Sequence, residues 1–98
     1  MTHSITAQDF QEAMKQPNAL VIDIRNTTDF TKNHVTKALS LPVTSIPNHI
    51  HQLDTNKTYY IVSYSGRRSE TIASYLQENG FHAVHVIGGM HALNELAA

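Results

Sequence analysis

Two uninterrupted apolar runs, at residues 19–22 and 59–62, constrain the fold of this chain more than any other feature. A strand with one face in water alternates apolar and polar residues, and neither run alternates. Continuous apolar strands are typical of parallel sheets whose two faces are both covered by helices. The sequence therefore predicts an α/β fold with helical layers on both sides of a sheet.

Helix signals precede the first run and follow the second. Thr6 followed by Asp9 resembles a capping box, and an apolar stripe at helical spacing follows it. A second stripe, at residues 72–76, ends at Gly80, a common helix terminator. Alternating strands and helices imply right-handed crossovers, and hence a three-layer α/β/α domain with a mainly parallel sheet of about five strands. The expected helices lie near residues 6–16, 27–29, 44–53, 69–80 and 89–96, and two further strands near 39–41 and 81–87.

Size and charge narrow the function classes. The 98 residues fit one domain, residues 1–98, which buries roughly 60–70% of the surface its unfolded chain exposes. Lys and Arg number 7 against 8 Asp and Glu, so there is no broad basic field and we expect no nucleic-acid partner. We find no leader-like start and no apolar run near the roughly 20 residues of a membrane span, which favours a cytoplasmic protein without a membrane partner.

The second apolar run leads into the segment Ser63-Tyr64-Ser65-Gly66-Arg67-Arg68-Ser69, which then opens a helix. Ligands of open α/β sheets bind outside the carboxyl ends of the strands. Gly66 allows the backbone to turn its N–H groups inward, and the helix N-terminus adds partial positive charge. Arg67 and Arg68 add bidentate donors for oxyanions. We predict an anion-binding loop; the alternative is a plain turn with solvated arginines and Ser69 as the N-cap.

Other polar residues have simpler interpretations. Asp23 and Arg25 leave the end of the first apolar run beside this loop, and we expect an ion pair that supports it rather than direct substrate contact. Two histidine pairs have short spacings, His49 with His51 and His82 with His85. Both spacings place the two rings on different faces of their elements, so we expect no metal site. No residue pattern points to a cofactor.

The segment from Ser63 to Ser69 resembles the Cys-x-x-Gly-x-Arg-Ser active-site loop of single-domain rhodanese-like sulfurtransferases, with Ser63 standing where the family has cysteine. Residues 21–25 are similar to the family's Val-Asp-Val-Arg strand end, and residues 88–93 resemble its Gly-Gly-x-x-Ala-Trp ending. Residues 29–35 and 38–42 also resemble family motifs in the same order. The chain departs from the pattern at Asn33, Lys37 and Leu93, which replace two glycines and a tryptophan.

The resemblance implies a reaction that this chain lacks the atom to perform. In the family the cysteine takes a sulfane sulfur from a donor such as thiosulfate, holds it as a persulfide and passes it to an acceptor. A helix terminus supplies roughly 2 kcal/mol, enough to lower a thiol pKa from about 8.5 to about 7. The chain contains no cysteine. The hydroxyl of Ser63 holds its proton far more tightly, the loop sequence supplies no general base, and oxygen forms no persulfide. We therefore predict no sulfurtransferase activity.

Three functions are consistent with these observations. The first is a non-catalytic rhodanese-like module that binds an oxyanion, or a protein partner, through the loop at Ser63. The second is an active sulfurtransferase, with a sulfane-sulfur donor and a sulfur acceptor as partners, whose cysteine has been changed to serine. The third is a relative of phosphatases and arsenate reductases, which bind phosphate in similar loops. The six residues from Ser63 to Arg68 match the sulfurtransferase length, one fewer than phosphatases of this kind use.

Overall fold

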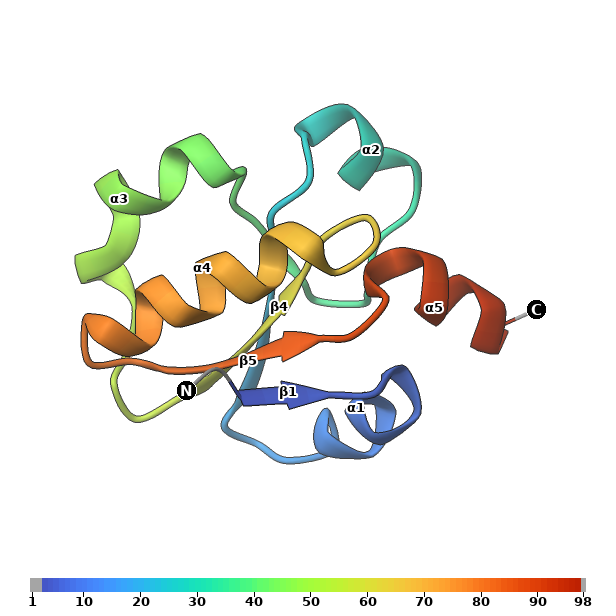
Figure 1. Ribbon diagram of the computed structural model, residues 1–98, viewed down its shortest axis with the longest axis horizontal. Helices are drawn as coiled ribbons and strands as arrows, with labels where there is room; N and C mark the ends of the chain where they lie inside the picture. Colours follow the sequence, from blue (N-terminus) through green and yellow to red (C-terminus); the bar gives the residue numbers. More distant parts are fainter. Residues whose placement is uncertain (1–2, 98) are drawn as a thin grey trace.

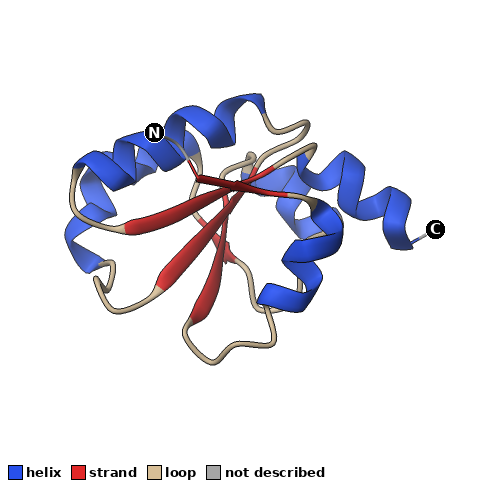
Figure 2. Cartoon of the chain, turned by 60° about the horizontal axis from the view of Figure 1, so that its bottom comes forward, coloured by secondary structure: helices blue, strands red, loops and turns tan. Residues whose placement is uncertain are grey.

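The computed structural model describes residues 3–97 and contains one five-stranded, all-parallel sheet (Figure 1). The strand order is β1-β5-β4-β2-β3, which places β4 at the centre. Helices cover the sheet on both sides (Figure 2). The predicted α/β architecture is therefore confirmed. The strands are β1 (His3–Ile5), β2 (Ala19–Asp23), β3 (Leu39–Ser40), β4 (Thr58–Val62) and β5 (His82–Val86).

Two separate cores explain the apolar runs. One cluster packs the sheet against α4 and α3, and the other packs its opposite face against α1 and α5. Ile61 belongs to the first cluster and Val62 to the second, and both are fully buried. Successive residues of β4 thus enter opposite cores, which is why the run does not alternate. The helices are α1 (Ala7–Ala13), α2 (Thr27–Lys32), α3 (Ile46–His49), α4 (Arg67–Glu78) and α5 (Gly89–Ala97).

The predicted helix ends form by specific hydrogen bonds. Thr6 Oγ1 accepts a hydrogen bond from the Asp9 amide at 3.1 Å, which makes it the N-cap of α1. At the end of α4, Gly80 donates to the Gln77 carbonyl at 3.1 Å and Phe81 to the Leu76 carbonyl at 3.0 Å. Gly80 has φ 90°, so this is a Schellman ending that requires the left-handed backbone of a glycine.

Three features differ from the sequence-based expectation, and a fourth, the backbone of Lys37, concerns a turn. The edge strand β1 lies in a segment where we predicted no strand. The prediction missed it because β1 has only three residues and pairs with β5 alone. Helix α4 begins at Arg67, so Ser69 is its third residue and Gly66 is the N-cap. The single helix expected over residues 44–53 is instead the short helix α3 between two 3₁₀ turns, Val43–Ser45 and Ile50–Gln52. Lys37, which stands where the family has glycine, has φ 66°, a conformation that costs an L-residue about 1–2 kcal/mol.

None of the helices within residues 3–97 combines the length and the apolar character needed to cross a bilayer.

Candidate functional site

The loop between β4 and α4 makes a tight turn that only glycine allows. Gly66 has φ 98°, in the left-handed region, and caps α4. A Cβ atom added there would lie 2.8 Å from the Gly88 nitrogen and 3.1 Å from His85 Cε1. The turn therefore fits closely against the end of β5 and the start of α5.

Helix α5 holds the loop from its outer side. The Met90 amide donates to the Ser63 carbonyl at 2.8 Å, and the His91 amide donates to the Tyr64 carbonyl at 3.1 Å. Gly89 makes this approach possible, since a Cβ atom there would lie 2.3 Å from the Ser63 carbonyl oxygen. The first turn of α5 thus fixes the direction of two loop carbonyls.

The opposite side of the loop borders a cavity of about 290 Å³. It lies at the carboxyl end of β4, where open α/β sheets bind ligands. Arg67 and Arg68 are exposed, and neither forms an ion pair within the described part of the chain. A larger cavity, of about 600 Å³, reaches Ala19 at the amino end of β2, so we favour the smaller one as the site. The smaller cavity is lined by Ser63, Tyr64, Ser65, Arg67 and Arg68.

Two of the predicted anion-binding residues do not line this cavity. Gly66 contributes its backbone turn, and Ser69 is fully buried behind the loop. The Ser63 hydroxyl accepts a hydrogen bond from the Gly66 amide at 2.9 Å and donates to Ser69 Oγ at 3.3 Å. Ser69 Oγ donates to the Gly66 carbonyl at 3.0 Å and lies 2.6 Å from His85 Nδ1. A chain of polar groups therefore runs from Ser63 through Ser69 to His85.

Sequence reasoning missed His85 as a neighbour of the loop. It is buried in β5 and its backbone pairs with Ile61 of β4. Alternation along β5 places it on the same face as Ala83, which packs in the core beneath α4. That alternation is the signal that would have located His85 under the loop.

The burial of His85 makes the stability of the fold sensitive to acid. Burial lowers the pKa of His85, and the Glu70 carboxylate offsets part of this effect. As the pH falls below about 6.5, the unfolded chain takes up a proton before the folded one, so the contribution is complete above that pH and is lost below it. In His85→Asn, which keeps a polar side chain beside Ser69, we expect urea-unfolding free energy to depend less on pH between about 7.5 and 5. The exposed His91→Asn should retain the wild-type slope, and a wild-type slope in His85→Asn would contradict this account.

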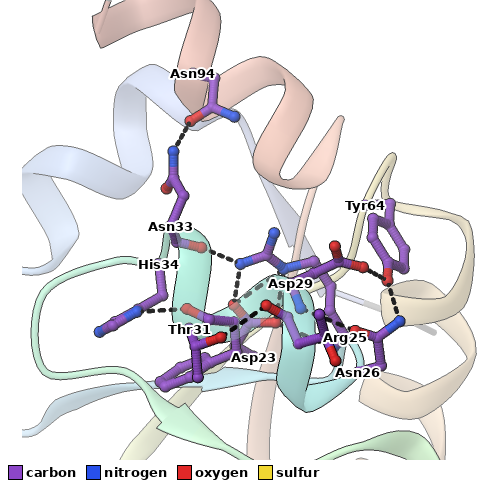
Figure 3. Close-up of polar contacts among 11 residues, drawn as sticks. Asp23, Arg25, Asn26, Asp29, Thr31, Asn33, His34, Tyr64 and Asn94 are labelled. Atoms are coloured by element: carbon purple, nitrogen blue, oxygen red, sulfur yellow. Dashed lines mark hydrogen bonds and ion pairs between the residues drawn. The ribbon is translucent and has the colours of Figure 1, made fainter.

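A buried ion pair lies beside the loop, at the end of β2 (Figure 3). Arg25 Nη2 lies 2.8 Å from Asp23 Oδ2, and Arg25 Nε donates to Asp23 Oδ1 at 3.0 Å. The Arg25 amide also donates to Asp23 Oδ1, and Nη2 donates to the Asn33 carbonyl. Its hydrogen bond with Asp23 raises the pKa of Arg25. The pair therefore joins β2 to the segment after α2.

Tyr64 links this pair to the loop (Figure 3). Its ring lies 5.8 Å from the Arg25 guanidinium carbon, a cation–π contact. Its hydroxyl donates to Asp29 Oδ2 and accepts from Asn26 Nδ2 at 2.9 Å. The hydrogen bond to Asp29 raises the pKa of Tyr64. Asn26 also caps α2, and neither Asn26 nor Asp29 was expected at the site, because their contact with residue 64 arises only in the fold.

Of the two histidine pairs, only His85 reaches the site, through its contact with Ser69. His82 is exposed and His85 is buried, as expected for residues on different faces of β5. Within residues 3–97 no three His, Asp or Glu side chains come together in a metal-binding cluster.

Comparison with known proteins identifies the family. Residues 6–96 match the family model of the rhodanese-like domain. The thiosulfate sulfurtransferase GlpE of Pseudomonas syringae is 31% identical over 78 residues, which cover 80% of this chain and 74% of the relative. The putative sulfurtransferase YtwF of Bacillus subtilis is 35% identical over 72 residues, which cover 74% of this chain and 70% of the relative.

Comparison with solved structures gives the same family. The crystal structure of a rhodanese-like domain protein from Staphylococcus aureus superposes with a TM-score of 0.88 at 31% identity, covering 94% of this chain and 91% of that one. A rhodanese-related protein from Thermoplasma volcanium has a TM-score of 0.90 at 24% identity, over 96% and 92% of the two chains, and supports the fold alone. By sequence and by architecture, this chain belongs to the rhodanese-like domain family.

Proposed function

We propose that this chain is a rhodanese-like module that binds a small oxyanion in the cavity at the loop from Ser63 to Ser69, and that it is inactive as a sulfurtransferase. The observation that carries the proposal is the residue at the end of β4. The chain has no cysteine, and Ser63 occupies the loop position where the family's nucleophile is expected. A sulfane sulfur therefore has no thiolate to accept it.

The surroundings of the cavity support oxyanion binding. The N-terminus of the twelve-residue helix α4 faces the loop, and its first N–H groups have no partner within the helix. Arg67 and Arg68 are exposed beside it, and no carboxylate within residues 3–97 pairs with either. The cavity residues thus contribute positive charge only.

The relatives favour a sulfurtransferase origin over a phosphatase one. The two sequence relatives compared above are named as a sulfurtransferase and a putative sulfurtransferase, and the loop has the sulfurtransferase length. A partner protein that accepts sulfur would belong to the reaction of a cysteine-bearing form.

The arginines provide the first test. Calorimetric titration of the wild-type chain with inorganic sulfate and phosphate should detect binding, and replacing both Arg67 and Arg68 by Ala should weaken it by about tenfold or more, since each removes a charge-assisted donor. The control replaces Lys15 and Lys57 by Ala, which removes the same charge away from the cavity, and should leave affinity close to that of the wild type. Equal affinities in the two double variants would remove the arginines from the site. If the wild-type chain binds neither sulfate nor phosphate, the proposed function is wrong.

A further inference from the structure

The Ser63 hydroxyl donates its proton to Ser69, away from the cavity. Ser63 lines the cavity, yet it is only 3% exposed and its hydrogen bonds point into the protein. It receives the Gly66 amide proton at 2.9 Å and gives its own proton to Ser69 Oγ at 3.3 Å. A hydroxyl has one proton and two lone pairs. What Ser63 still offers to the cavity is a lone pair.

Ser69 and His85 fix this direction. Ser69 has a single proton, and two acceptors compete for it: the Gly66 carbonyl at 3.0 Å and, when its Nδ1 carries no proton, His85 at 2.6 Å. If His85 Nδ1 carries a proton, it donates to Ser69 and the Ser69 proton goes to the Gly66 carbonyl. In both arrangements Ser69 has no proton left for Ser63 and accepts one from it. The buried chain therefore keeps Ser63 an acceptor toward the cavity.

An acceptor at this position distinguishes two anions of the same shape and charge. At mildly alkaline pH, hydrogen phosphate and sulfate are both tetrahedral dianions, so the arginines and the helix terminus attract them alike. Only hydrogen phosphate keeps a proton to donate to Ser63. Sulfate, like thiosulfate, places an oxygen lone pair against the serine lone pair, and an unmet buried acceptor costs binding free energy.

We propose that the loop selects an oxyanion that retains a proton, of the hydrogen phosphate type, over fully ionised sulfate or thiosulfate. Ser63 is the specificity-determining residue, and Ser69 with His85 are the residues that position its proton. This selectivity rests on the proposed function, since it needs an anion in the cavity.

The test compares inorganic phosphate with inorganic sulfate by calorimetry at one mildly alkaline pH. The wild type should bind phosphate about tenfold or more tightly than sulfate. In Ser63→Ala the ratio of the two affinities should fall close to one, because the acceptor is gone. In Ser69→Ala the Ser63 proton is released toward the cavity, so sulfate should gain affinity relative to phosphate.

Ser65→Ala is the matched control. Ser65 lines the same cavity, is exposed and forms no hydrogen bond within residues 3–97, so its hydroxyl rotates to suit either anion. Its loss should leave the phosphate to sulfate ratio unchanged. If wild-type sulfate binding equals or exceeds phosphate binding, or if Ser63→Ala keeps the phosphate preference, the selectivity is overturned while the anion site stands. If neither anion binds, the proposed function fails together with the selectivity.

Discussion

Replacing Ser63 by Cys should create thiosulfate:cyanide sulfurtransferase activity, whereas we expect none from the wild-type chain. The side chain of residue 63 already receives the Gly66 amide at 2.9 Å and lies at the N-terminal end of α4, two features that stabilise a thiolate. A thiolate at this position can attack the sulfane sulfur of thiosulfate, which breaks the S–S bond of the donor, releases sulfite and leaves a persulfide on the cysteine at position 63. Cyanide then takes the outer sulfur as thiocyanate and restores the thiolate. This is the largest change in activity that we expect from one substitution, because it supplies the reacting atom itself.

The control for this experiment is Ser65→Cys. Residue 65 lines the same cavity, but it is exposed and receives no loop amide, so its thiol should keep an ordinary pKa and remain inactive. Steady-state thiocyanate production measures all three forms. Turnover by the wild-type serine form would refute the predicted inactivity. A silent Ser63→Cys that still binds an oxyanion would show that the site has lost more than its nucleophile.

Removing the guanidinium of Arg25 should produce the largest loss of stability. Asp23 is 1% exposed, and Arg25 is its ion-pair partner within the described residues. Arg25→Met keeps much of the apolar side chain but leaves a buried carboxylate without its counter-ion, which costs about 3–5 kcal/mol of unfolding free energy. Urea unfolding followed by circular dichroism measures the loss.

The matched control removes an exposed ion pair. Lys15 lies 3.1 Å from Glu12, with both side chains more than 70% exposed, so Lys15→Met should change the unfolding free energy by less than about 1 kcal/mol. The double variant with Asp23→Asn and Arg25→Met should recover part of the loss, since it removes the uncompensated charge. A small effect of Arg25→Met, comparable to the surface control, would show that water reaches Asp23 and that the pair does not support the loop.

The fold was predictable where burial or a tight turn restricts which residue types the sequence can have. The run at residues 59–62 and the second half of the run at 19–22 are apolar because helices cover both faces of the sheet there, so their pattern indicated a covered parallel sheet. Leu20 continues the apolar run although it is 39% exposed. The turn at Gly66 and the ending at Gly80 were visible because each needs a backbone that glycine alone adopts easily. Strand β1 has no comparable sequence pattern, since its short segment is ordered by pairing with β5 at the far end of the chain.

The site was predictable only in its local part. Ser63, Arg67 and Arg68 lie within six residues of one loop, and the resemblance to a family loop placed them together. His85 and Asp29 reach the same loop from other elements, through the register of β5 with β4 and the packing of α2. Alternation along β5 indicates which face His85 lies on, but the contact of Asp29 with Tyr64 depends on how α2 docks, and no spacing in the sequence encodes it.

The most direct test of the central claim is to follow the backbone amide resonances of the wild-type chain during a titration with inorganic phosphate. If the loop is an oxyanion cradle that lacks only its sulfur atom, saturable shifts will centre on the amides of Ser65, Arg67 and Arg68. Shifts centred on the larger cavity near Lys15 and Lys37, or none that saturate, would contradict it.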